Sequence, residues 1–204
     1  MMKKLKNEKG SFAIISAILV FVVVLAISAY SDMIAKRWAI NEVQAIMDAS
    51  GSNALKSTID VKLLRDEILG IDENNMADTN NNPEQSIKAT DYKRKIKKAY
   101  LKELEQQVKT NNTIRELNVQ TVNVSFDYDT FGLGESENPK PQITIESVTK
   151  MKVRSKEFMD YADGLNADIY SSRNNSTFNV TYAGQSEDGV TELVIHSVTR
   201  LVYR

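Results

Sequence analysis

The stretch FAIISAILVFVVVLAISAY, residues Phe12 to Tyr30, decides the fold of this 204-residue chain because it contains no charged side chain. As a helix that rises about 1.5 Å per residue, it is just long enough to cross a hydrocarbon core of roughly 30 Å. We therefore predict a membrane-spanning helix. Tyr30 would lie at its outer end, at the membrane interface that favours amphipathic rings.

Charges on either side of this span predict its orientation. Residues 1–10 form a basic leader with four lysines against one glutamate, while the residues directly after the span are of mixed sign. Because the basic flank of a span stays in the cytoplasm, we expect a single pass through the cell membrane with residues 31–204 extracytoplasmic. A cleaved secretory signal is the alternative, since residues 26–29, Ala-Ile-Ser-Ala, approach a signal-peptidase site.

The leader also contains a processing motif. Gly10 follows a charged stretch and Ser11 directly precedes the apolar run, as in prepilin-type sites, where cleavage would fall between these two residues. The alternative is that Gly10 only breaks the chain before the helix.

We predict that the helix continues past the membrane, so that one element covers residues 11–56. Residues 33–55 contain no proline and repeat apolar residues at helical spacing, and Gly51 and Ser52 mark the expected fraying end. The apolar residues of this stripe are Ile40, Val43 and Met47.

Several short motifs follow one another along roughly residues 9–55, about a quarter of the chain. These motifs are Lys9-Gly10 before the apolar run, Asp32 near its outer end, Ala35-Lys36-Arg37, and Gln44 followed by Asp48 and Ala49. In this order the motifs resemble the N-terminal segment of the TadE/TadG-like proteins of tight-adherence pilus systems.

The resemblance implies a pilin-like membrane protein that a prepilin peptidase processes and that packs with other pilin-like or pilus-assembly subunits. The stripe of Ile40, Val43 and Met47 is the face that we expect to meet those subunits. One position departs from the pattern, because Ile15 stands where many pilin-like proteins carry a glutamate. The resemblance therefore implies a minor or accessory component and not the shaft protein.

Residues 57–113 form a second region, which we predict to be helical with a polar interruption. A short helix is expected over residues 60–69, followed by an Asn-rich loop over residues 72–85. Over residues 91–109, apolar side chains recur every fourth position, which is typical of an amphipathic helix.

Residues 114–204 change to the two-residue period of strands and contain a repeat. Residues 143–154 share five identities with residues 193–204, and residues 121–126 share three with residues 177–182. We interpret the repeat as a duplicated antiparallel hairpin, with convergence of strand-forming residues as the alternative. Between the hairpins we expect a short helix or connection over residues 156–166 and a strand over 168–172. The predicted class is α+β, with a long helix and an antiparallel sheet domain, as in pilins and pseudopilins.

Residues for chemistry are scarce. The chain has no cysteine and one histidine, His196, so a thiol nucleophile and a histidine-based metal site are excluded. Residues 127–138 begin like a calcium loop, but Phe131 and Asn138 occupy two ligand positions. We therefore predict no catalytic, cofactor or metal site, and no enzyme.

The residues after the span exclude one further class of partner. Residues 31–204 contain 22 Lys and Arg against 26 Asp and Glu, a formal charge of −4, which argues against nucleic acid. We predict a minor pilin-like or pilus-assembly component of a type IV or Tad-like pilus or secretion system. The alternative is an uncleaved, membrane-tethered ectodomain that binds a ligand or partner in a conjugation or competence apparatus.

Overall fold

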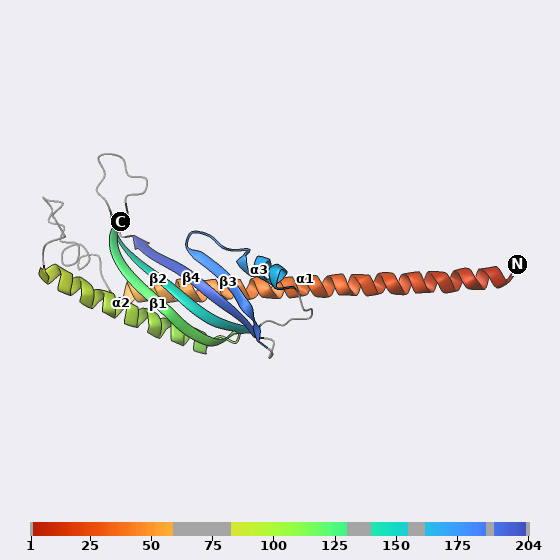
Figure 1. Ribbon diagram of the computed structural model, residues 1–204, viewed down its shortest axis with the longest axis horizontal. Coiled ribbons are helices and arrows are strands. Elements are labelled where there is room, and N and C mark those ends of the chain that lie inside the picture. The colour runs from red at the N-terminus through yellow and green to blue at the C-terminus, as the bar shows by residue number, and fades with distance from the viewer. Residues whose placement is uncertain (1, 59–82, 130–139, 155–161, 187–189, 203–204) are drawn as a thin grey trace, which may run out of the picture.

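A single helix connects the two parts of the molecule in the computed structural model, which describes residues 2–58, 83–129, 140–154, 162–186 and 190–202. The N-terminal half of this helix, α1, projects alone, and its C-terminal half packs against a sheet (Figure 1). The elements in chain order are α1 (Met2–Thr58), α2 (Pro83–Lys109), β1 (Ile114–Asp129), β2 (Lys140–Arg154), α3 (Asp163–Ser171), β3 (Phe178–Ser186) and β4 (Val190–Val202).

The four strands form one antiparallel sheet in the order β1-β2-β4-β3. Along β2 and β4, buried and less buried residues alternate, because successive side chains of a strand point to opposite faces. The buried face shares one hydrophobic core with α1 and α2. The other face carries cross-strand ion pairs, such as Lys150 with Glu192 at 2.6 Å and Lys152 with Glu116 at 2.6 Å.

This arrangement confirms the predicted α+β class, with its long N-terminal apolar helix and antiparallel sheet. The sequence shows why the elements form: α1 contains no proline, and the strands alternate apolar and polar residues. A hairpin alone is marginal in water, and helices in proteins owe most of their stability to tertiary packing, so the shared core stabilises these elements together.

The helix α1 ends at Thr58, two residues past the predicted bound at residue 56, but the expected fraying at Gly51 and Ser52 does not occur, because both residues are helical. Gly51 is buried where α1 crosses β4, and a Cβ atom added there would lie 2.4 Å from Oγ1 of Thr199. The glycine therefore permits close approach of helix and strand and does not terminate the helix.

The two hairpins have matching registers at the positions that the repeat aligns. Phe126 of β1 pairs with Ile143 of β2, and their aligned counterparts, Tyr182 and Leu193, pair in the second hairpin. Ser147 and Ser197, also aligned, pair with each other where β2 meets β4. A common origin of the hairpins stays a prediction, since strands of similar composition also converge.

Two other elements differ from the predictions, and two predictions cannot be compared with the structure. Helix α2 begins at Pro83, so the end of the predicted loop over residues 72–85 is helical. The predicted strand over residues 168–172 is wrong, because α3 covers most of it. The predicted helix over residues 60–69 and most of the calcium-like loop lie outside the described residues.

Candidate functional site at the junction of stalk and body

The exposed N-terminal half of α1 is the first part of the candidate site. We call residues 11–31 the stalk and the described residues from Asp32 onward the body. The stalk has no charged side chain, and its large apolar residues are exposed, from Phe12 at 73% to Leu25 at 39%. Among the described residues, one helix, which contains the stalk, is long and apolar enough to cross a membrane.

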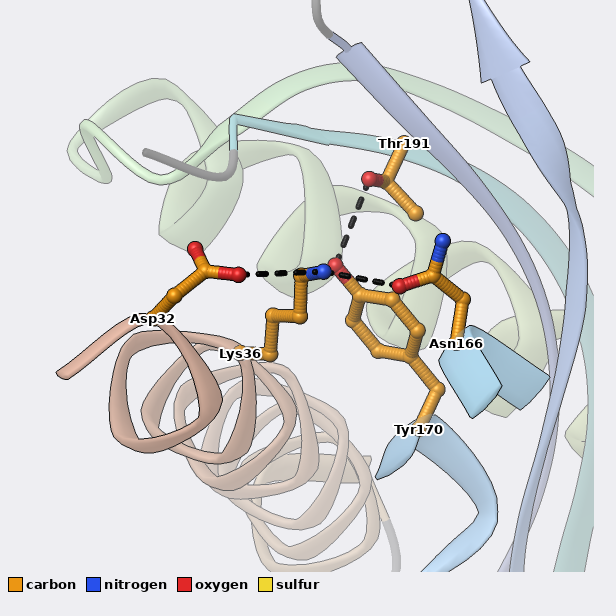
Figure 2. Close-up of polar contacts among 5 residues, drawn as sticks. All are labelled: Asp32, Lys36, Asn166, Tyr170 and Thr191. Atoms are coloured by element: carbon orange, nitrogen blue, oxygen red, sulfur yellow. Dashed lines mark hydrogen bonds and ion pairs between the residues drawn. The ribbon is translucent and has the colours of Figure 1, made fainter. Parts of the chain in front are cut away.

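The junction between stalk and body contains a buried ion pair. Oδ2 of Asp32 lies 3.3 Å from Nζ of Lys36, one helical turn further along α1, and both side chains have no exposed surface. Nζ of Lys36 also donates a hydrogen bond of 2.7 Å to Oδ1 of Asn166 in α3 (Figure 2). A buried charge is tolerated only when it is paired, so the carboxylate and the amide together hold the ammonium group in place.

Helix α3 connects this ion pair to the sheet. The hydroxyl of Tyr170 donates a hydrogen bond of 3.3 Å to Oγ1 of Thr191 in β4, and both residues are buried (Figure 2). The Tyr170 ring also stacks on Tyr182 of β3, with centroids 5.7 Å apart. Because α3 contacts α1 on one side and the strands on the other, it fixes the body to the end of the stalk.

The structure separates the three family-like positions of α1. Asp32 is fully buried in the ion pair. Gln44, about three turns further along the helix, is half-buried, and Asp48, about four turns further along, is exposed. Partial loss of water contact raises the pKa of the Asp48 carboxyl above its ordinary value. Of the three residues, therefore, Asp32 alone takes part in the junction.

The expected assembly face of α1 is wrong. Ile40, Val43 and Met47 have no exposed surface, because they pack in the hydrophobic core of their own chain. Sδ of Met47 lies 3.7 Å from the hydroxyl of Tyr100, which is also 2.8 Å from Oγ of Ser147. These residues join α1, α2 and β2, and they are not available to another subunit.

The predicted processing site lies within α1. Gly10 and Ser11 are both helical, so Gly10 does not break the chain before the helix, as the alternative interpretation required. Processing between the two residues stays a prediction.

In the sequence, the one indication of the junction is the spacing of Asp32 and Lys36, which is typical of an ion pair on one helix. Asn166 lies 130 positions from Lys36 in the chain. Asn166 lies in the segment that was predicted as a short helix or connection, and Tyr170 in the segment that was predicted as a strand, so their contacts could not be anticipated.

No group of three or more potential metal ligands occurs among the residues that the structure describes. Comparisons of the chain with protein-family models, with curated proteins and with solved structures found no match.

Proposed function

We propose that this chain is an anchored structural protein, a minor pilin-like component of a type IV or Tad-like pilus or secretion system. The observation that carries the proposal is the continuity of α1, which runs without interruption from an exposed apolar stalk into the core of a sheet domain. One rigid element then serves both as the membrane anchor and as the support of the body.

The burial of α1 supports assembly through the stalk and not through the body half of the helix. The chain's own core buries Ile40, Val43 and Met47, whereas stalk residues such as Ile18 are exposed at 58%. An apolar helix in lipid packs with other helices through close van der Waals contact, and the exposed stalk offers such a surface.

A photo-reactive amino acid in the stalk tests assembly. Placed at Ile18 in cells, it should form covalent adducts with other single-span membrane proteins, whereas the same residue at Ile40 should form none, because Ile40 is buried. Adducts with lipid alone at Ile18 would contradict the assembly role. The chain would then be a tethered ectodomain.

Sequencing of the N-terminus of the membrane-extracted protein tests processing. A start at Ser11 is the expected result, and the substitution Gly10→Leu should leave the leader attached. A start at Met1 in the unchanged protein would remove the prepilin-type step from the proposal and leave the anchor in place.

A further inference from the structure

The surface of α1 past the apolar run indicates where the membrane ends. Tyr30, Ile34 and Trp38 are exposed at 62%, 45% and 69%, and their spacing of four residues places them on one stripe of the helix. At about 100° per residue, this stripe lies opposite Asp32 and Lys36, which are buried against the body. An aromatic and aliphatic stripe therefore continues two turns beyond the stalk.

The buried ion pair removes the charges that would otherwise end the apolar surface. Although Asp32 and Lys36 follow the stalk directly in the sequence, neither side chain has any exposed surface. From Ser11 onward, the first exposed charge on α1 is that of Arg37. The exposed surface of α1 is therefore uncharged from Ser11 to Ala35.

Bilayer dimensions agree with a boundary at this exposed charge. The helical positions of Lys9 and Arg37 are separated by about 42 Å at 1.5 Å per residue, which matches the 40–45 Å of a bilayer with its headgroups. With the boundary at Tyr30, Trp38 would lie about 12 Å further out, past a headgroup layer only about 5–8 Å thick. Arginine and tryptophan are the side chains favoured at the interface itself.

We propose that the outer membrane interface lies at Arg37 and Trp38, so that the body is seated directly on the bilayer with α3 in the headgroup layer. The hydrogen bond between Lys36 and Asn166 holds α3 at the same level of the helix as Trp38. Leu165 of α3 is exposed at 48%, which gives the body an apolar contact at this level. The partner is the lipid surface, and this inference rests on the proposed membrane anchor.

The fluorescence of Trp38 provides a direct test, because it is the only tryptophan of the chain. The full chain is reconstituted into vesicles of phosphatidylcholine and phosphatidylglycerol, with bromine atoms on the acyl chains either near the headgroup or near the bilayer centre. We expect the shallow bromines to quench Trp38 more strongly than the deep ones. Its emission should lie at a shorter wavelength than that of tryptophan in water.

Three variants in the background Trp38→Phe calibrate the depth. Val22→Trp places the probe in the stalk, Ala45→Trp places it on the same stripe about 10 Å further out, and Leu165→Trp places it on α3. We expect deep quenching for position 22, shallow quenching for position 165, and for position 45 exposure to aqueous iodide without quenching by lipid.

The possible results distinguish the seated body from the membrane anchor. If position 22 is quenched while positions 38 and 165 respond only to iodide, the anchor stands and the seated body is wrong. Equal lipid quenching at positions 38 and 45 would also contradict the inference, because the boundary would then lie further along α1. If the acyl-chain bromines do not quench tryptophan at position 22, the membrane anchor itself is wrong.

Discussion

At the scale of single residues, Lys36 determines whether the start of the body can be buried. Its ammonium group is the counter-ion of Asp32 and donates a hydrogen bond to Asn166, and solvent reaches neither the ammonium group nor the carboxylate. Neither carboxylate oxygen of Asp32 has a hydrogen-bond donor among the described residues, so its stabilisation depends on that single charge.

Replacement of Lys36 by methionine should therefore destabilise the body strongly. Removal of one partner of a buried pair leaves the other charge uncompensated, which costs about 3–5 kcal/mol. The measurement is the free energy of unfolding by denaturant in detergent. Arg37→Met, at the exposed neighbouring position, is the matched control and should change little.

The double variant Asp32→Asn with Lys36→Met distinguishes charge from shape. Because it removes both charges, it should recover much of the stability that Lys36→Met loses. Stability as low as that of the single variant would show that packing, and not the uncompensated carboxylate, is responsible.

Gly51 provides a second prediction at this scale. Gly51→Ala should destabilise the protein by about 1–3 kcal/mol, because the new methyl group would meet the Thr199 side chain and force helix and strand apart. Gly164→Ala in α3 is the control, since its Cβ would have no atom within 4 Å. That control should be neutral or stabilising by about 0.5–1 kcal/mol, as expected in a helix. Thermal unfolding of both variants decides between these results.

At the scale of elements, α2 is fixed to the sheet through a buried phenol. Tyr100 is only 1% exposed, and its hydroxyl lies 2.8 Å from Oγ of Ser147 in β2. Burial raises the pKa of Tyr100 from 10.0 to about 12, because the phenolate would lose its water, and the hydrogen bond with Ser147 opposes this only in part.

The raised pKa predicts a specific loss of stability in alkali. The folded state favours the protonated phenol, so this contribution is complete below pH 10 and is lost as the pH rises toward about 12. Tyr100→Phe should lack this loss. At neutral pH the variant should be less stable by about 1–3 kcal/mol, because Ser147 loses its partner.

The comparison is made by denaturant titration at a series of pH values. Tyr92→Phe, on the same helix but only partly buried, is the control and should keep the profile of the unchanged protein. Parallel curves for Tyr100→Phe and the unchanged protein above pH 10 would contradict the assignment.

The success of sequence-based prediction also differs between elements. Periodicity predicted the course of α1, most of α2 and the two hairpins, because each of these elements has a long, regular pattern of apolar residues that face the core. It misplaced α3, because a short helix or connection was expected only as far as residue 166 and a strand after it. Few of the nine residues of α3 are buried, and the helix is stabilised by contacts with distant residues such as Lys36. It also misread Gly51, since a packing glycine and a terminating glycine look alike in sequence.

The candidate site was less predictable than the fold. The apolar stalk follows from composition alone, but the direction in which each residue of α1 faces does not. The stripe of Ile40, Val43 and Met47 was correctly identified as apolar, yet nothing local could show that α2 and β2 cover it. The burial of Asp32 and Lys36 required knowledge of where α3 lies.

At the scale of the whole molecule, the hydrophobic core of the body is built from residues of the body alone, among the residues that the structure describes. All buried hydrophobic residues of the core cluster lie at Ala39 or beyond, and the ion pair at the junction begins at Asp32. The stalk contributes no residue to that cluster, so the body can bury its core without the stalk.

A chain that begins at Ser31, the last residue of the stalk, should therefore fold without the rest of the stalk. We expect it to be recovered without detergent, with the circular dichroism of a mixed helix and sheet protein, while the full chain stays in the membrane fraction. Size-exclusion chromatography and circular dichroism make the comparison. An unfolded or aggregated product would show that the stalk is needed for the body to fold.

The unbroken course of α1 also has a mechanical consequence. The helix α1 has no break between the stalk and the body, since it is helical from Met2 to Thr58 and α3 contacts it where the body begins (Figure 1). A sideways force on the sheet would therefore tilt the whole of α1. For a lipid-embedded length of about 30 Å, a tilt of about 10° displaces the inner end sideways by about 5 Å. If α1 spans a bilayer as proposed, a force on the body would in this way displace the N-terminal end of the helix on the opposite side of the membrane.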